Sequence, residues 1–154
     1  CWYLFILLVL ITVTASEPRT RKLSLIIHTA DKITAETSCH IFATITWKHS
    51  HSKFRSLLDN PDRNDFEKGA VDIFQVDIKT NNTHEDVPSK IKFEHHCDTN
   101  QGYSRNHYGA WEFTKLKLLF GSHIYFVFND GKKIHDQEQE TFDVLIALDH
   151  CRPK

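Results

Sequence analysis

The sequence predicts an all-β fold, an antiparallel β-sandwich of two roughly four-stranded sheets. Short runs rich in β-branched, aromatic and leucine residues recur along the chain, and several alternate strictly with polar residues. Turn-forming groups such as Asn60-Pro61-Asp62 and Asn129-Asp130-Gly131 separate these runs. No segment shows a convincing helical period. Many short strands separated by polar turns are typical of a sandwich.

The alternation is clearest in the first two expected strands. Leu23, Leu25 and Ile27 recur at every second position, as do Ile41 and Ala43 in the next run. Alternate residues of a strand point to opposite faces, so each of these strands is expected to bury one face. Most of the 11 phenylalanines are expected to fill the core. The expected strands cover residues 22–29, 39–47, 71–78, 91–94, 110–120, 124–128 and 141–148.

The 154 residues leave room for one domain. Residues 2–12 are almost wholly apolar, and the small residues Val13-Thr14-Ala15 follow, as in a secretory signal peptide. We therefore expect a signal peptide at 1–15 whose true start precedes Cys1, a basic lead segment at 16–22 and the sandwich at 23–151. A retained signal anchor is the alternative, but the apolar run is shorter than the ~20 residues of a membrane span. The expected location is secreted and extracellular.

The charge balance excludes one class of partner. The chain carries 19 Lys and Arg against 20 Asp and Glu. A nucleic-acid-binding protein needs a basic surface to neutralise phosphates. Nucleic acid is therefore not an expected partner.

The cysteines predict a disulfide without fixing its pairing. If Cys1 leaves with the signal peptide, the candidates are Cys39, Cys97 and Cys151. Three cysteines in an oxidising compartment suggest one bridge and one free or intermolecular thiol. The pair Cys97–Cys151 is preferred, because it would anchor the end of the chain.

No catalytic constellation is evident. The chain has no Gly-x-Ser-x-Gly elbow and no glycine-rich phosphate loop. Cys97 lies beside His95 and His96, but neighbours on a strand point to opposite faces, and bridging explains Cys97 better. We predict that the protein is not an enzyme.

Two histidine-containing segments are candidates for metal binding. His49-x-His51 and His95-His96-Cys97-Asp98 carry suitable ligand types, but neither has the spacing of a structural zinc site. Histidines that face the solvent are the preferred interpretation of both.

Two segments resemble the PLAT/LH2 domain family. The first contains Phe66-Glu67-Lys68-Gly69 and, after an acidic residue, Phe74 in the next strand. The second is a strand ending in histidine at residues 90–96, followed by the strand that Trp111 opens. The resemblance covers about residues 22–151. Residues 142–151 are also similar to the end of the C-terminal domain of pancreatic-type lipases. Phe66, Glu67, Gly69, Phe74 and Trp111 are interpreted as structural family residues, with Gly69 providing a turn.

The resemblance implies a C2-like sandwich that docks onto lipid membranes or onto a lipid-handling protein. Members of the family often bind calcium at loop ends, and the matching positions leave Asp31 and Glu36 as ligands. Ala30 and Ser38 depart from the family pattern, which puts calcium in doubt, since a hard cation needs several oxygen ligands together. No other cofactor is expected.

Two surface features complete the expectations. Tyr103, Arg105 and Tyr108 combine aromatic and basic character, which suits a lipid headgroup region or a partner surface. The other interpretation, an ordinary polar loop whose tyrosines pack along the sheet, is the preferred one. Asn81 begins an N-glycosylation sequon. The alternative function is a secreted effector or venom-type component that has lost lipid and calcium binding and acts only on proteins.

Overall fold

Eleven β-strands make up the part of the chain that the structure describes. The computed structural model describes residues 19–80, 86–97 and 109–147. In this part no helix is long and apolar enough to cross a bilayer. The strands are β1 (Arg19–Thr29), β2 (His40–Trp47), β3 (Lys53–Leu58), β4 (Val71–Thr80), β5 (Pro88–His96), β6 (Ala110–Trp111), β7 (Phe113–Phe120), β8 (His123–Phe128), β9 (Ile134–His135), β10 (Gln139–Asp143) and β11 (Leu145–Ile146).

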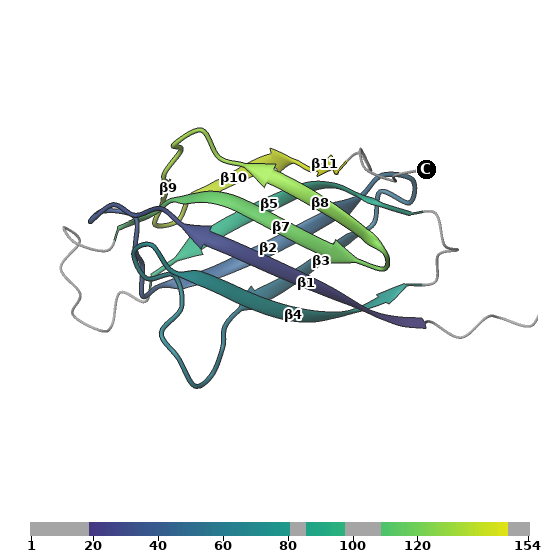
Figure 1. Cartoon of the computed structure of the whole chain (residues 1–154), viewed down its shortest axis with the longest axis horizontal. Helices are drawn as coiled ribbons and strands as arrows, with labels where there is room; N and C mark the ends of the chain where they lie inside the picture. The colour runs from purple at the N-terminus through teal and green to yellow at the C-terminus, as the bar shows by residue number, and fades with distance from the viewer. Residues whose placement is uncertain (1–18, 81–85, 98–108, 148–154) are drawn as a thin grey trace, which may run out of the picture.

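Two antiparallel sheets form the layers of a sandwich. The five-stranded sheet has the order β11-β8-β7-β1-β4, and the four-stranded sheet has the order β10-β5-β2-β3. Figure 1 shows the first sheet lying over the second. Strands β6 and β9 form a separate pair. The predicted antiparallel sandwich is confirmed.

Strand β1 lies inside its sheet, between β4 and β7. Its residues Leu23, Leu25 and Ile27 are at most 1% exposed. They face the core, and the residues between them face outward, as the alternation predicted. Ile41, Ala43 and Ile45 of β2 face the same core from the other sheet.

The first strand is longer than expected. It begins at Arg19, so residues 19–22 of the expected lead segment belong to the sandwich. Arg21 pairs in register with Ile78, and its guanidinium lies 4.0 Å from the centre of the Phe120 ring. The backbone of Arg21 thus belongs to the strand, while its long cationic side chain packs on an aromatic ring.

Strands β3 and β9 were not expected, and the expected strands 110–120 and 141–148 are each divided in two. In β3, Phe54 and Leu58 are separated by the half-buried Ser56, so the apolar alternation is weak. The expected strand 110–120 is divided at Glu112, where the pairing between β1 and β7 shifts after His28. Strands β9, β10 and β11 are short, and β10 and β11 replace the single strand expected at 141–148.

Trp111 is at the centre of an aromatic cluster. Its ring centre lies 5.1 Å from that of Phe66, 5.2 Å from that of Phe93 and 5.4 Å from that of Phe113. The indole is fully buried, and its Nε1–H donates a hydrogen bond to Thr29 Oγ1 at 3.4 Å. Trp111 therefore joins residues from both sheets.

The loop before β4 is held by a buried carboxylate. Asp72 Oδ2 accepts a hydrogen bond from the Phe66 backbone N–H at 2.8 Å, and the Arg63 guanidinium also pairs with Asp72. Burial raises the pKa of Asp72. Phe66 adopts a positive φ of 62° and stacks on Phe74 with ring centres 5.3 Å apart. These contacts hold Phe66 in a backbone conformation that non-glycine residues rarely adopt.

The other family-like residues of this loop form its turn. Gly69 has a φ of 67°, as expected for a turn glycine, and its N–H donates to the Ala30 carbonyl at 3.2 Å. The carbonyl of the exposed Glu67 accepts from the Ala70 N–H at 3.0 Å.

Candidate functional site

The outer surface of the five-stranded sheet carries eight apolar side chains among its polar ones. The outward positions of its strands are the odd residues of β4 and the even residues of β1 and β8, together with alternate residues of β7. We call this surface the apolar face, and Figure 1 is viewed onto it. Its apolar members are Ile26, Val71, Ile73, Leu119, Ile124, Phe126, Phe128 and Leu145, and its lysines are Lys22, Lys79, Lys115 and Lys117.

The strand register brings these side chains together. Ile26 lies opposite Ile73 on one side and Lys117 on the other. Lys117 lies opposite Phe126, which in turn lies opposite Leu145. Residues from five strands thus form one continuous row across the sheet.

Five of the eight apolar side chains in this face are exposed, and Ile26, Leu119 and Phe126 are half-buried. Ile73 is 51% exposed, Phe128 55% and Leu145 54%. Eight large apolar side chains in the described residues are exposed, and five of them belong to this face. Single exposed apolar residues are ordinary, whereas a contiguous group marks an interaction surface.

The charges of the apolar face are mostly positive. Its four lysines are accompanied by one acidic residue, Asp77. In the described part of the chain none of these lysines forms an ion pair. Lys115 Nζ instead lies 4.8 Å from the centre of the Phe126 ring. The face therefore offers apolar contact area together with four lysines that form no ion pair among the described residues, although Lys22 lies opposite Asp77 across β1 and β4.

The outer surface of the four-stranded sheet is different. Arg55 and Lys92 both pair with Glu94, at 2.7 and 2.5 Å, and Lys90 pairs with Asp143 at 3.1 Å. Hydrogen bonds from Lys92 and Arg55 lower the pKa of Glu94. This surface has the paired charges of an ordinary solvent-facing sheet.

The residues predicted to bind lipid and the predicted glycosylation site lie outside the residues that the structure describes. They are Tyr103, Arg105, Tyr108 and Asn81.

Sequence reasoning missed the apolar face, although the sequence contains one signal for it. Residues 124–128 are continuously apolar, but only Tyr125 and Val127 point inward.

The two predicted calcium ligands lie on either side of a lysine. Lys68 Nζ is 3.7 Å from Asp31 Oδ1, and the Lys68 backbone N–H donates to Glu36 Oε2 at 3.4 Å. Within the described ranges, these carboxylates are not part of a group of three His, Cys or acidic residues that could hold a metal ion. An ammonium group beside Asp31 competes electrostatically with a divalent cation.

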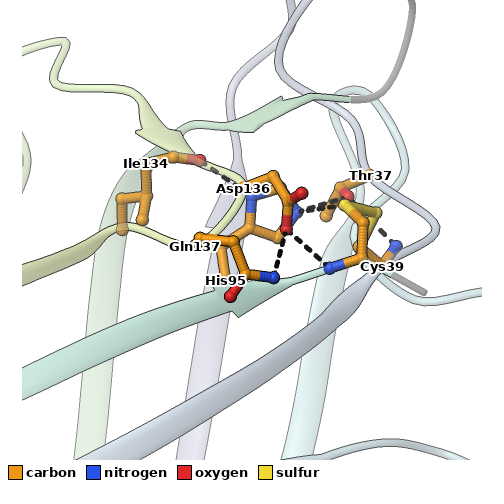
Figure 2. The surroundings of a disulfide bond; sticks show 7 residues. Thr37, Cys39, His95, Ile134, Asp136 and Gln137 are labelled. Carbon is orange, nitrogen blue, oxygen red and sulfur yellow. Dashed lines mark hydrogen bonds between the residues drawn. A yellow bond between two sulfur atoms is a disulfide. The ribbon is translucent and has the colours of Figure 1, made fainter. Parts of the chain in front are cut away.

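The disulfide joins Cys39 to Cys97 (Figure 2). Strands β2 and β5 are neighbours, and His40 lies opposite His96 at the end of their ladder. The next residues outward are the two cysteines, whose Cα atoms are 4.6 Å apart, within bridging distance. The preferred pairing Cys97–Cys151 was wrong, because Cys97 already has its partner across the sheet. Cys151 lies outside the described residues.

His95 lies beside this disulfide and is fully buried. The preferred interpretation of a solvent-facing histidine was wrong here, because His95 points to the core side of β5; His49 and His51 are exposed as expected. His95 Nδ1 is 3.0 Å from the Ile134 carbonyl oxygen, which only accepts, so Nδ1 carries the proton. Nε2 then accepts from Thr37 Oγ1 at 2.9 Å.

Burial lowers the pKa of His95, against the opposing effect of the Ile134 carbonyl and of Asp136. The unfolded chain therefore binds this proton at a higher pH than the folded protein does. We expect the contribution of His95 to the free energy of unfolding to be constant above about pH 7 and to fall below about pH 6.5, by at most about 1.4 kcal/mol per pH unit. Urea unfolding between pH 7.5 and 5 measures this dependence. His95→Asn should remove the slope and His96→Asn should keep it; an equal slope in both variants would assign it to another group.

The fold is an antiparallel β-sandwich domain whose five-stranded sheet has exposed apolar side chains and lysines on its outer surface. The PLAT/LH2 domain profile matches residues 23–143. The chain therefore belongs to the PLAT/LH2 domain family, as its residues had suggested.

Solved structures share this fold. Alpha toxin from Clostridium absonum is 21% identical, with a TM-score of 0.64 over 82% of this chain and 32% of the toxin. Alpha-toxin from an avian strain of Clostridium perfringens is 17% identical, with a TM-score of 0.60 over 84% of this chain and 33% of that toxin. Coral 8R-lipoxygenase is 15% identical, with a TM-score of 0.59 over 80% of this chain and 17% of the enzyme. The chain thus spans about a third of the length of each toxin and a smaller share of the lipoxygenase. No curated protein matches the chain.

Proposed function

We propose that this protein is a secreted, non-catalytic docking module that binds an anionic lipid surface through its apolar face. The observation that carries the proposal is the combination of exposed Ile73, Phe128 and Leu145 with four lysines that have no ion-pair partner in the described residues. Apolar side chains gain free energy when they leave water at a bilayer interface. Lysine stems can lie along the same interface while their ammonium groups reach the headgroups.

Electrostatics selects the kind of lipid. A lysine close to an anionic membrane contributes about 1 kcal/mol, and this contribution weakens with added salt. The positive charge of the apolar face comes from side chains, so binding does not need calcium to bridge protein and lipid. Coral 8R-lipoxygenase, in contrast, is activated by calcium through its C2-like domain. In this chain the ammonium group of Lys68 beside Asp31 favours a calcium-independent mode.

Co-sedimentation with vesicles tests this proposal. The protein should pellet with phosphatidylcholine vesicles that contain phosphatidylserine, equally well with calcium or chelator, and should remain largely in the supernatant with pure phosphatidylcholine. The variant Ile73→Glu/Phe128→Glu should bind about 10- to 100-fold more weakly, because two apolar contacts are lost and two negative charges are added.

Ile33→Glu is the control. Ile33 is 79% exposed in the loop between β1 and β2, outside the five-stranded sheet, so its replacement loses one exposed apolar side chain and adds one negative charge, as each substitution of the double variant does. A loss of binding in Ile33→Glu equal to that in the double variant would contradict the assignment to the apolar face. Binding that requires calcium would contradict the calcium-independent mode.

A protein partner is the second candidate occupant of the apolar face. In the toxin and lipoxygenase structures the matching region is one part of a longer chain. If wild-type protein stays in the supernatant with every vesicle, the lipid proposal fails. Cross-linking at Lys115 and Lys117 in an extract of the organism that makes the protein, compared between wild type and Ile73→Glu/Phe128→Glu, would then identify a protein that uses this face.

A further inference from the structure

A second group of side chains combines the ligand types of a metal site. Within the described ranges, Cys39, His95 and Cys97 form a group of three whose ligand atoms all lie within 4.8 Å of one another. Figure 2 shows His95 beside the disulfide of Cys39. The two cysteines are half-buried, whereas His95 is fully buried.

The histidine ring is held as in many metal ligands. Its Nδ1–H donates to the Ile134 carbonyl, which fixes the ring and leaves Nε2 unprotonated, 3.7 Å from Cys97 Sγ. Histidine ligands of metal ions commonly donate their second ring N–H to a carbonyl or carboxylate in this way. Thr37 Oγ1 is the hydrogen-bond partner of Nε2 in the disulfide form, and this hydroxyl can move aside by rotation about one bond.

The spacing fits a tetrahedral metal ion once the disulfide is open. His95 Nε2 lies 3.7 Å from Cys97 Sγ. With metal–sulfur and metal–nitrogen distances of about 2.3 and 2.0 Å, tetrahedral sulfur and nitrogen ligands lie about 3.5 Å apart. Two thiolate ligands lie about 3.8 Å apart in the same geometry, so the sulfurs must separate from their bonded position.

The backbone at this position is held independently of the sulfur–sulfur bond. The Cys97 N–H donates to Asp136 Oδ1 at 2.8 Å, and the His95 N–H donates to the Glu138 carbonyl at 3.1 Å. The β2–β5 ladder continues up to His40 and His96. Opening the disulfide therefore leaves both thiols at the same end of the sheet.

We propose that Cys39, His95 and Cys97 form a redox-gated metal site, which binds Zn²⁺ or a similar borderline ion when the cysteines are reduced. A dithiol reductant supplies two electrons and two protons to the disulfide and itself becomes a disulfide. Zn²⁺ then binds both thiolates and Nε2, which releases the two thiol protons, and solvent fills the fourth position. A disulfide oxidant then accepts two electrons from the thiolates, takes up two protons and becomes a dithiol, while the Cys39–Cys97 bond re-forms and the ion is released.

Cobalt(II) titration tests this proposal, because tetrahedral thiolate–cobalt sites have intense visible bands and thiolate charge-transfer bands. The full chain with Cys1→Ser and Cys151→Ser is reduced with a phosphine without oxygen, so that the only thiols are Cys39 and Cys97. One cobalt ion per chain should bind with these bands, and Zn²⁺ should displace it. The unreduced protein should show no bands.

Two histidine variants in this background separate the proposed site from a chance thiol pair. His95→Asn should weaken cobalt binding at least about 100-fold, since the loss of a supporting contact alone costs about 10- to 100-fold. His96→Asn is the matched control and should bind as the parent does, because His96 is half-buried and edge-on to Phe42. Zn²⁺ should also raise the melting temperature of the reduced parent but not of the unreduced protein.

Three outcomes would overturn the proposal. The first is a reduced parent that stays folded by circular dichroism yet shows no thiolate–cobalt bands. The second is equal cobalt binding by His95→Asn and His96→Asn, which would leave the histidine without a role. If the reduced parent unfolds, added Zn²⁺ should refold it, and failure to do so would exclude the site.

Discussion

Replacing Trp111 with alanine is expected to lower the free energy of unfolding by about 3–5 kcal/mol. The indole is 0% exposed and contacts Phe66, Phe93 and Phe113. Its loss removes apolar burial, leaves a cavity between the sheets and removes the hydrogen bond to Thr29. Urea unfolding followed by far-ultraviolet circular dichroism measures the change.

Phe128→Ala is the control for this prediction. Phe128 is 55% exposed, so its truncation should change the free energy of unfolding by less than about 1 kcal/mol. A loss in Trp111→Ala as small as that in Phe128→Ala would show that Trp111 does not hold the sheets together.

Removal of the disulfide is expected to have the second large effect. Cys39 and Cys97 are 58 residues apart in the sequence, so the bridge closes a long loop in the unfolded chain. The loop-entropy relation gives a loss of about 4 kcal/mol for Cys39→Ser/Cys97→Ser. Domains of this size are stable by roughly 5–15 kcal/mol, so the variant should remain folded in the cold with a lower melting temperature.

Differential scanning calorimetry checks this expectation, with Cys151→Ser as the control. The control should melt like wild type, because it leaves the Cys39–Cys97 bridge intact. An equal loss in both variants would indicate that Cys151 also takes part in a stabilising bond. Zn²⁺ should not raise the melting temperature of the double serine variant, which lacks both thiolate ligands.

Local patterns predicted the interior of the fold better than its edges. Leu23, Leu25 and Ile27 alternate because β1 has a neighbour on each side and one face on the core. Strand β3 has only β2 as a neighbour, and its inward positions include the polar Ser56. Its sequence therefore lacks the apolar alternation that would have predicted a strand. The alternation of apolar and polar residues is strong in an internal strand that buries one face completely, and it is weak in a strand at the edge of a sheet.

The candidate sites depend on the order of strands, which local patterns do not encode. The partner of Cys97 follows from β2 lying beside β5, a contact between segments far apart in the sequence. The apolar face likewise requires Ile73, Ile26 and Phe126 to fall in one row through three pairs of strands. The ligand types around Cys97 were evident in the sequence, but the burial of His95 was not, because it depends on which face of β5 meets the core.

The position of β1 also constrains when the protein can fold during its synthesis. Strand β1 is made first among the described strands, yet its partners are β4 and β7, which end at Thr80 and Phe120. The ribosome must therefore synthesise about three quarters of this sequence before β1 can pair with both β4 and β7. Until then its apolar positions Leu23, Leu25 and Ile27 have no complete core to enter. Pairing over such distances is slow, so the nascent chain should depend on chaperones until β7 emerges.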